Sequence, residues 1–572
     1  SSSVPVGTQL MFDASASSDD LSGCIQTYEW DFNGDDTYEV TTTSSIEYHR
    51  FESTGTKTVT VRVTDHAGNT DTTSTQVDVS STTHAVATAS TTDAAVGEAI
   101  DFDGSSSTAA SMYAWEYTGS QDFQDALGAT TSTSFGSKGV YTVSLLVDDG
   151  TITGVVDPDT SVDAKRIIDA TGKHVLPGGV DPHVHMMDPG DTEREDFRTG
   201  TAAAAAGGVT TVADQHRHPK EGVLTTEIFE EKREYLADRA RIDYGLMAGG
   251  HPENVDELEE LQEAGAIGFK SFTCEVHGVP ALKSDYMMDV FTEVERVGGT
   301  SMVHPEDDRM VNANEETIKE TTRTDGSVIP DWRTKEAEQV AVSTTLQIAK
   351  QTGVSMWFAH LSHPELIDQV NHAKEQGVDA LAETCPHYLY LTREDVERDA
   401  PYTMFTPPAR EKADREEMWE RLANGEIDMI NADHAPATKE EKERGMDNVF
   451  DAPFGIPGIE TVLPLLLNGV NDEKITLNRV AEVFSTTPAK VMGIYPKKGA
   501  LRVGSDADFV IADMNRKKTL RNEDVVAKCG WTPYDGLTIT GIPEATHVRG
   551  KPVVEDGEII GEPGYGEFIA RP

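Results

Sequence analysis

The stretch Asp181-Pro182-His183-Val184-His185 decides how the larger part of this 572-residue chain is interpreted. It ends an apolar run around Val180 that is typical of a buried strand. Side chains at positions i and i+2 of a strand point to the same face, so His183 and His185 can hold one metal ion together. A single His-x-His pair is weak evidence, and its meaning depends on the ends of the other strands.

Strand-like apolar runs alternate with helical patterns from about residue 176 onward. The helical patterns include 253–264, 281–298, 334–351 and 412–424. This alternation is typical of a parallel α/β fold, and eight such units over residues 176–495 predict a (β/α)8 TIM barrel. The eight runs lie around Val180, Thr210, Tyr244, Gly268, Met302, Met356, Ala380 and Met429.

Residue types that bind metals recur at the predicted carboxyl ends of these strands, where the active groups of such barrels lie. Lys270 lies in the fourth run, His304 ends the fifth, His360 the sixth and Asp433 the eighth. Imidazole and carboxylate suit zinc and similar ions. A buried lysine loses its proton easily, and its neutral amine can take up carbon dioxide as a carbamate that bridges two metals. The pattern predicts a two-metal hydrolytic site with a bridging hydroxide, whose proton Asp433 shuttles.

With these residues in place, the chain resembles the amidohydrolase superfamily and, within it, the cyclic amidases allantoinase, hydantoinase/dihydropyrimidinase and dihydroorotase. The resemblance spans about residues 141–572. The stretches that support it are Ala202–Val212, Glu383–Tyr388, Thr406–Arg410, Ile427–Pro436, Gly455–Leu463, Gly504–Asp508 and Gly564–Gly566.

The resemblance implies metal or catalytic roles for six residues: His183, His185, Lys270, His304, His360 and Asp433. His183 and His185 would bind the first metal ion with Asp433. Carbamylated Lys270 would bridge to a second ion held by His304 and His360, and Asp433 would carry a proton to the leaving ring nitrogen. The expected cofactors are therefore two divalent ions, zinc in the first instance, and the CO2-derived carbamate on Lys270.

The residues around the predicted site bear on the substrate. Dihydroorotases typically carry an arginine two residues after the His-x-His pair, where this chain has Met187, and a thioether cannot pair with a carboxylate. Hydantoinases typically place a tyrosine shortly after the lysine, where this chain has Ser271–Glu275. The surroundings of Lys270 look most like allantoinase, so allantoin is the first expectation and the other two activities are alternatives. The candidate substrate contacts are Met187, Cys274, Thr406 and Gly455.

Residues 1–149 have a different texture, rich in Ser, Thr, Asp and Gly, with an internal repeat. Phe12-Asp13 recurs as Phe102-Asp103, and Trp30 recurs as Trp115. Two β-sandwiches are expected, at 1–80 and 83–149. The first resembles a PKD domain, and the second is a degenerate copy. That resemblance implies a spacer or adhesive module without catalysis.

A small β-rich satellite domain is expected from residues 141–175 together with 496–572, which flank the barrel on both sides in sequence. Residues 141–149 match both the last strand of the second repeat and an early strand of the satellite. Either the repeat's strand serves the satellite, or the satellite is trimmed, and the sequence leaves both open.

The composition excludes some partners. The chain holds 99 Asp and Glu against 48 Lys and Arg, a net charge of −51. Nucleic acids and anionic membranes demand clustered Lys and Arg, and no apolar stretch approaches the ~18 residues of a membrane span. Both halves are acidic, which we interpret as a halophilic surface whose self-repulsion is screened by salt.

The remaining expectations concern partners and location. A small cyclic amide or ureide is the expected partner, and a homo-oligomer (dimer or tetramer) is expected by analogy. The PKD-like repeats favour the cell surface or exterior in high salt, and the hydrolase family favours the cytoplasm. The rival hypothesis is a non-catalytic surface or scaffold protein that reuses the hydrolase fold.

Overall fold

The structure of the protein is a computed structural model. The chain divides into two compact units, residues 1–145 with 154–161 and residues 146–153 with 162–572. The structure describes residues 4–5, 9–14, 17, 25–34, 37–43, 45–51, 53, 55–65, 69–80, 88–89, 100–103, 114–115, 126–127, 130–133, 144–148, 150–156, 164, 166–216, 222–276 and 279–571.

The first unit begins with a β-sandwich. One sheet has the order β1-β7-β6-β3-β4, and β2 pairs with β5 in the other. Aromatic side chains fill the space between them: Trp30 stacks on Phe32 at 6.0 Å, and Phe12 meets Phe32 edge-on at 5.4 Å. The strands are β1 (Val4–Pro5), β2 (Gln9–Asp13), β3 (Ile25–Asp31), β4 (Val40–Thr42), β5 (Ile46–Arg50), β6 (Gly55–Asp65) and β7 (Thr70–Ser80).

Most of residues 83–149 lie outside the described residues. The described parts form a sheet of order β12-β9-β8 and the pair β10–β11. The second sandwich therefore stays a prediction. These strands are β8 (Thr88–Ala89), β9 (Ile100–Asp103), β10 (Ala114–Trp115), β11 (Ala126–Leu127) and β12 (Thr130–Thr133).

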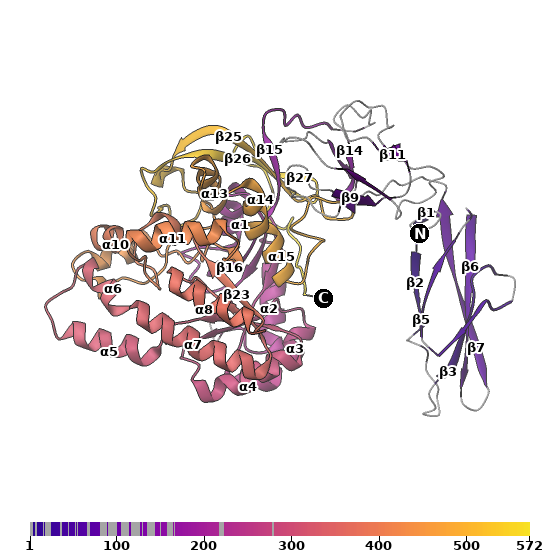
Figure 1. Cartoon of the computed structure of the whole chain (residues 1–572), viewed down its shortest axis with the longest axis horizontal. Helices are drawn as coiled ribbons and strands as arrows, with labels where there is room; N and C mark the ends of the chain where they lie inside the picture. The colour runs from indigo at the N-terminus through magenta and orange to yellow at the C-terminus, as the bar shows by residue number, and fades with distance from the viewer. Residues whose placement is uncertain are drawn as a thin grey trace. The chain divides into compact units, whose positions relative to one another are not determined.

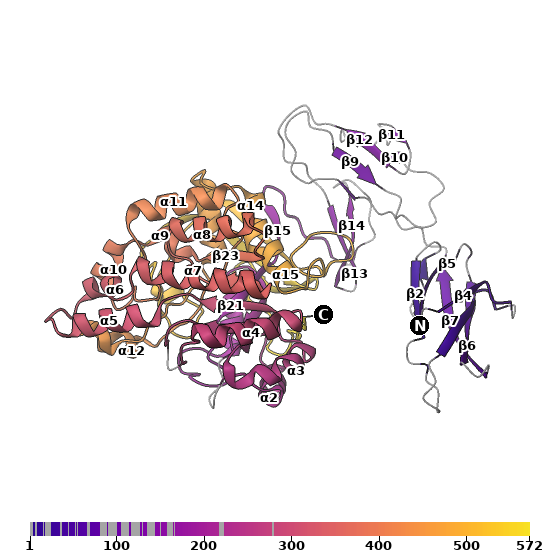
Figure 2. The same ribbon diagram turned by 60° about the horizontal axis from the view of Figure 1, so that its bottom comes forward.

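The second unit is built around a parallel barrel (Figures 1 and 2). Strands pair in the order β16-β17-β18 and β19-β20-β21-β22-β23-β24. β18 and β19 are two parts of one barrel strand, interrupted at Met247, and the bridge between Val184 and His434 closes the ring. The strands are β16 (Gly179–Val184), β17 (Val209–Asp214), β18 (Asp243–Leu246), β19 (Ala248–Gly249), β20 (Phe269–Phe272), β21 (Thr300–His304), β22 (Ser355–Phe358), β23 (Ala380–Thr384) and β24 (Met429–Ile430). The predicted TIM barrel is confirmed.

Helices surround the strands in both views of the fold (Figures 1 and 2). In α7, the Thr334 hydroxyl accepts a hydrogen bond from the Ala337 N–H at the start, and Gly353 at φ 80° ends the helix. The helices are α1 (Phe197–Ala206), α2 (Thr226–Leu236), α3 (Leu258–Glu263), α4 (Ser284–Arg296), α5 (Asp308–Lys319), α6 (Ile329–Trp332), α7 (Lys335–Thr352), α8 (Pro364–Glu375), α9 (Pro386–Tyr390), α10 (Arg393–Asp399), α11 (Lys412–Ala423), α12 (Lys439–Glu443), α13 (Val462–Asn471), α14 (Leu477–Ala481) and α15 (Thr487–Val491). Among the described residues, none of the helices combines the length and apolar character that a membrane crossing requires.

A separate apolar cluster fills the inside of the barrel, with Met302 and Trp357 among its members. Residues 564–571 run across the amino end of the strands. Phe568 forms a parallel bridge with Tyr244, and the Arg571 guanidinium donates to the carbonyls of Ile267 and Val491 at 3.0 and 3.1 Å. This segment therefore covers the starts of β18 and β20, and Ala489, Met492 and Ile494 belong to the interior cluster.

A five-stranded sheet of order β15-β25-β26-β27-β28 lies beside the barrel, with α13 packed on β26 (Figure 1). It joins residues that precede the barrel in sequence to residues that follow it. Near the junction, Ile152 is fully buried and exchanges backbone hydrogen bonds with Gly504 and Ser505, at 2.9 Å each. The five strands are β15 (His174–Pro177), β25 (Phe509–Thr519), β26 (Thr538–Val548), β27 (Lys551–Glu555) and β28 (Glu558–Ile559). β13 (Ser144–Asp148) and β14 (Thr151–Val156) pair with each other, in a separate two-stranded sheet.

A buried ion-pair network ties this sheet to the amino end of the barrel. The Lys498 ammonium lies against Asp243 at the start of β18, and 2.8 and 2.9 Å from carboxylate oxygens of Asp506 and Asp508. The Arg549 guanidinium also pairs with Asp243. Three buried carboxylates are thus matched by Lys498, Arg549 and the more exposed Lys497, as buried charges require.

Candidate active site

The structure places the six predicted metal and catalytic residues at the carboxyl end of the barrel. His183 lies in β16, and His185 follows its last residue. Lys270 lies in β20, and His304 ends β21. His360 and Asp433 stand two and three residues beyond the ends of β22 and β24. Strands far apart in sequence therefore bring all six to one end of one barrel.

The side chains converge on Asp433. Its Oδ1 lies 3.2 Å from His183 Nε2 and 3.5 Å from His185 Nε2. Ligand atoms of His183, His360 and Asp433 all lie within 4.8 Å of one another. The His304 and His360 rings are 4.5 Å apart between centroids. His185 and Asp433 are each 15 % exposed whereas His183 is 1 % exposed, so the cluster faces solvent through His185 and Asp433.

Three residues of the site adopt left-handed backbone conformations. The φ angles are +56° at Met187, +40° at His360 and +44° at Asp433. Non-glycine residues rarely adopt such angles, which persist only where the surroundings fix them and which concentrate at functional sites. The fold therefore holds these side chains in place at a conformational cost.

Burial sets the protonation of the cluster. It lowers the pKa of His183 and of His360 well below the usual value, with further lowering by neighbouring cationic groups. Burial also lowers the pKa of Lys270 to about 8. For Asp433, burial acts to raise the pKa, but His183, His185 and His360 hold it well below its usual range. At neutral pH the site offers neutral imidazoles and an ionised carboxylate, the forms that bind metal ions.

Glu383, at the end of β23, orients two of these residues. Its Oε1 lies 2.6 Å from His183 Nδ1 and accepts a hydrogen bond from the His360 backbone N–H at 3.2 Å. The Trp357 indole N–H donates to Oε2 at 2.6 Å. This leaves His183 Nε2 directed at Asp433. A carboxylate behind a histidine in this way is the usual support of a metal ligand.

Glu306 supports His304 in the same manner. Its Oε2 lies 2.7 Å from His304 Nε2 and 3.1 Å from the Arg333 guanidinium. Burial acts to raise the pKa of Glu306, but Arg333 and His304 bring it well below its usual value. His304 Nδ1 is left facing the cluster.

The four candidate substrate contacts lie around this cluster. The Thr406 hydroxyl donates to Glu306 at 2.7 Å, and the Cys274 thiol, fully buried, accepts from Arg333 at 3.5 Å. Both side chains therefore contact the support of His304. Gly455, at φ +113°, approaches the loop after β24 so closely that a Cβ would lie 2.1 Å from the Ala435 carbonyl oxygen. Met187 is buried at the end of β16.

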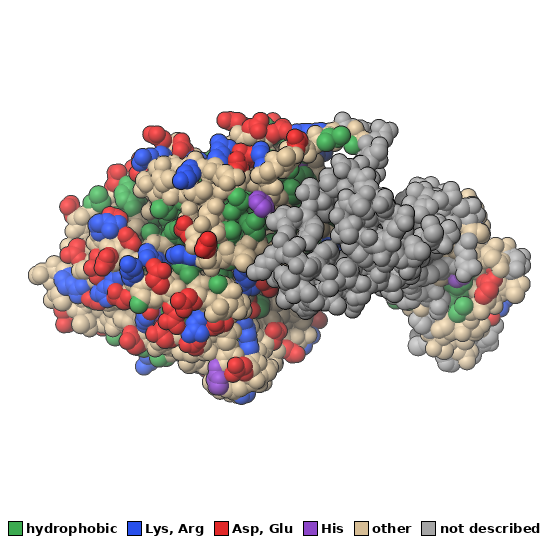
Figure 3. Space-filling model, turned by 45° about the horizontal axis from the view of Figure 1, so that its top comes forward, with side chains coloured by type: hydrophobic (Ala, Val, Ile, Leu, Met, Phe, Trp, Pro, Cys, Tyr) green, Lys and Arg blue, Asp and Glu red, His purple; other side chains and the backbone are tan. Residues whose placement is uncertain are grey.

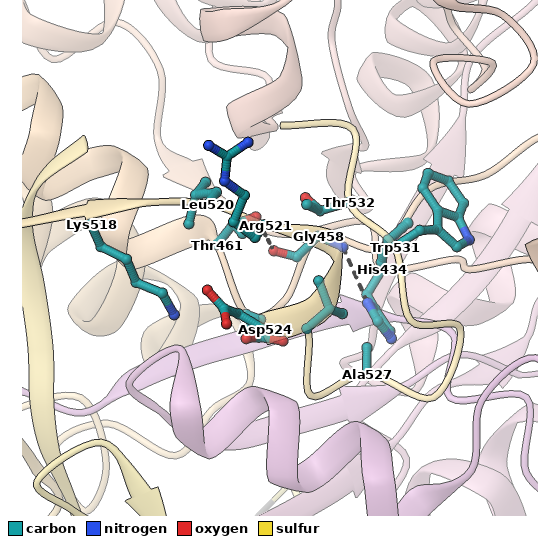
Figure 4. Close-up of a pocket in the computed structure, with 13 residues that line it drawn as sticks. His434, Gly458, Thr461, Lys518, Leu520, Arg521, Asp524, Ala527, Trp531 and Thr532 are labelled. Carbon is teal, nitrogen blue, oxygen red and sulfur yellow. Dashed lines mark hydrogen bonds between the residues drawn. The ribbon is translucent and has the colours of Figure 1, made fainter. Parts of the chain in front are cut away.

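His434, next to Asp433, fixes that loop from the other side. Its Nδ1 accepts the Gly458 N–H at 3.2 Å, and its ring borders a cavity of about 20 Å³ that Trp531, Lys518 and Arg521 also line (Figure 4). A cavity of this volume holds about one water molecule. His434 therefore links the backbone next to Asp433 to Gly458.

The donor set fits divalent metal ions. Ligand atoms of two imidazoles and a carboxylate lie within 4.8 Å of one another, close enough for one ion to contact all three, and the buried Lys270 interacts with the same side chains. The His360 Nδ1, in a side chain that is 1 % exposed, has no hydrogen-bond partner among the described residues. A buried imidazole nitrogen without a partner is costly unless a cation or water satisfies it.

Sequence reasoning missed Glu306, Glu383 and Arg333. Glu383 stands at the end of the seventh predicted strand, where no ligand was expected. Glu306 follows His304 by two residues. The i, i+2 rule that places His183 and His185 on one face therefore also places Glu306 on the same face as His304. Arg333 reaches the site from a loop between α6 and α7, and no local pattern marks it.

Comparisons with known proteins agree with this geometry. Residues 174–553 match the family model described as "Amidohydrolase family", and residues 1–79 match the PKD domain. The chain is 35 % identical to an L-hydantoinase of Paenarthrobacter aurescens over 440 residues, 76 % of this chain and 96 % of that protein. It is 35 % identical to an allantoinase of Deinococcus radiodurans (70 % and 89 %) and 33 % identical to a dihydroorotase of Methanosarcina mazei (74 % and 93 %).

The solved structure of the L-hydantoinase (dihydropyrimidinase) from Arthrobacter aurescens superposes with a TM-score of 0.73 at 35 % identity, covering 75 % of this chain and 96 % of that one. The barrel, its set of histidines, lysine and aspartate, and these relatives point to the same conclusion. The chain is a cyclic amidohydrolase that belongs to the amidohydrolase family and carries a PKD domain at residues 1–79.

Proposed function

We propose that the protein is a binuclear metal-dependent hydrolase that opens the ring of a cyclic ureide, with allantoin as the first candidate. The observation that carries the proposal is the convergence of four histidines, Lys270 and Asp433 at one end of the barrel. His183, His185 and Asp433 would hold one ion, His304 and His360 the other, and Lys270, as a carbamate, would join them. Two divalent ions held there would supply Lewis acidity and an acidified water for attack on the ring carbonyl.

The chain's own groups account for the remaining steps. Asp433 is ionised and partly exposed, so it can accept a proton and deliver it to the ring nitrogen as the C–N bond breaks. One water is consumed, and the products are a carboxylate and a free ureido nitrogen on one chain. Glu383 and Glu306 keep the histidines in the orientation that this geometry requires.

The identity of the ring rests on the residues beside the site. Met187 offers no charge to a substrate carboxylate, which argues against dihydroorotate. Hydantoins are the second candidate, because an L-hydantoinase is among the relatives at 35 % identity over nearly its whole length.

A substrate panel tests the proposal. The full chain, loaded with zinc, cobalt or manganese in molar salt, is offered allantoin, both enantiomers of a 5-substituted hydantoin, dihydrouracil and dihydroorotate. Ring opening is detected as the gain of one water by mass spectrometry, and allantoin is expected to give the highest kcat/KM. A folded protein with two bound metal ions that opens none of these rings contradicts the proposal and favours a scaffold role.

We also propose that the protein works in concentrated salt, at the cell surface or outside it. Asp and Glu side chains spread over the visible face of the second unit, with Lys and Arg among them (Figure 3). The chain's charge of −51 supports the part of the proposal that concerns salt, and the PKD domain at residues 1–79 supports the part that concerns location. Activity and folded fraction that both rise from low to molar potassium chloride would agree with it, and full activity at low salt would not.

A further inference from the structure

Outside the metal cluster, one lysine among the described residues of the second unit is fully buried with no ion pair to a carboxylate. Lys442, on the short helix α12, is 0 % exposed, and no salt bridge involves it among the described residues. Its Nζ donates hydrogen bonds to the carbonyl oxygens of Met404 at 3.1 Å and Pro453 at 2.9 Å. The Trp531 ring lies 5.6 Å from the same atom. Burying an ammonium group is unfavourable, so its position calls for an explanation.

The two carbonyls belong to the two segments that carry candidate substrate contacts. Met404 stands two residues before Thr406, and Pro453 two residues before Gly455. The Gly455 N–H also donates to the Met404 carbonyl at 3.0 Å, so one oxygen receives both Lys442 and the second segment. Lys442 therefore joins residues 404–406 to residues 453–455.

Both segments reach the metal cluster. The Thr406 hydroxyl contacts Glu306, which holds His304. Beyond Gly455, the Ile456 carbonyl accepts the Ala435 N–H at 3.0 Å, two residues after Asp433. Lys442 thus holds the backbone of two segments that contact the surroundings of His304 and Asp433.

The helix that carries Lys442 is itself fixed. Thr438 and Glu441 cap its start reciprocally, and Glu441 is held by Arg194 at 2.9 Å. Trp531 donates its indole N–H to the Ala437 carbonyl at 2.8 Å. Lys442 is consequently a rigid link rather than a mobile surface chain.

We propose that Lys442 is a positioning residue that joins the segments 404–406 and 453–455 and so sets how tightly the ring substrate is bound. The part of this proposal that concerns substrate rests on the proposed function. Lys442 touches neither the metal ligands nor the reacting atoms, so it acts on KM through the backbone of the two segments.

The test compares three variants in the full chain. Lys442→Met keeps the length of the side chain and removes its donors, and Lys442→Gln keeps one amide donor. Lys374→Met is the control, because Lys374 pairs with Asp428 at the opposite end of β24, away from both segments. Each variant is examined for bound metal, for hydrogen–deuterium exchange in the two segments, and for KM and kcat with the best ring substrate.

Lys442→Met is expected to speed exchange in both segments and to raise KM about tenfold, because the loosened segments must be ordered again when the ring binds, with two metals bound and kcat nearly unchanged. Lys442→Gln should recover part of KM, and the control should match the wild type. Unchanged exchange in both segments overturns the proposal, as does a fall in kcat at constant KM. If the wild type opens no ring, the proposed function fails, and the exchange result still decides whether Lys442 joins the segments.

Discussion

The two ends of the barrel each contain a buried lysine near carboxylates, and the pKa values of the two lysines are shifted in opposite directions. At the amino end, burial acts to lower the pKa of Lys498, but Asp508, Asp243 and Asp506 raise it above its usual value. At the carboxyl end, burial lowers the pKa of Lys270 to about 8, and Asp433 and Glu383 only partly oppose it.

The difference lies in how completely carboxylates neutralise the charge of each lysine. Around Lys498 the carboxylates lie in direct contact with the ammonium, and Arg549 adds a second cation. No carboxylate of the described residues forms an ion pair with Lys270, and its neighbours include the imidazoles of His183, His304 and His360, which supply no negative charge. The amino end is a closed ion-pair network that stabilises the fold, whereas the carboxyl end can exchange a proton for a metal ion or a carbamate.

If the carboxyl-end cluster contributed only to stability, as the amino-end cluster does, the two ends would not differ in function. Asp433→Asn is expected to lower kcat about 10³-fold, because it removes the group that carries the proton, while the protein stays folded. The measurement is steady-state turnover together with thermal unfolding. Asp428→Asn, at the other end of β24, is the control and should keep its activity. Substantial turnover by Asp433→Asn would show that another group moves the proton.

The amino end should respond in the reverse manner. Lys498→Met is expected to cost about 3–5 kcal/mol of unfolding free energy, because it leaves buried carboxylates unmatched, with kcat/KM of the folded protein unchanged. Lys497→Met is a close control: Lys497 contacts the same Asp506 but its side chain is 60 % exposed, so its loss should cost less than about 1 kcal/mol. Equal costs in urea unfolding would show that burial does not distinguish the two lysines.

A smaller effect is expected from the support of the metal cluster. Glu306→Gln should weaken metal binding about 10- to 100-fold, measured by competition with a chelator. The chain offers a matched control, because His363-Pro364-Glu365 repeats the order of His304-Pro305-Glu306, with the same 2.7 Å contact between histidine and glutamate. Glu365→Gln, away from the cluster, should leave metal affinity intact. Equal losses of metal affinity in both variants would show that Glu306 has no special role in metal binding.

The smallest effect concerns the pH dependence of the metal-free protein. Lys270 has a folded pKa of about 8 against about 10.4 for a free lysine. Between these values the unfolded chain binds the proton and the folded chain does not, so stability rises with pH, by up to about 1.4 kcal/mol per unit. Urea unfolding of wild type and Lys270→Met at pH 8 to 10 measures this as a difference. A wild type whose stability does not rise relative to the variant would place the lysine in a polar environment.

The sequence predicted the barrel and the six converging residues because both follow local rules. Alternating apolar periods mark strands and helices, and the ends of parallel strands meet at one edge. The boundaries differ from the prediction: the helix expected over 281–298 spans Ser284–Arg296, and the third strand is interrupted at Met247. Both differences depend on contacts that lie outside the short stretch of sequence from which an element is predicted.

The supporting contacts could not be predicted, because each joins residues far apart in the chain. Glu383 lies 200 residues from His183, and Asp243 lies 255 residues from Lys498. A carboxylate that orients a histidine has no fixed spacing, and a lysine looks the same in sequence whether it is matched or not. These contacts form only when the ring of strands closes. The sequence predicts the order of the strands but not which side chains then meet.

The segment 564–571, packed across the amino end of the barrel, has a consequence for vectorial synthesis. Ala489, Met492 and Ile494 belong to the interior apolar cluster and Ile569 packs against it. All four follow the eight strands in the chain, so during synthesis the strands emerge before these residues. Packing of this end of the hydrolase is therefore expected only after the strands have emerged, and a chain stalled before residue 489 would present that apolar opening to chaperones.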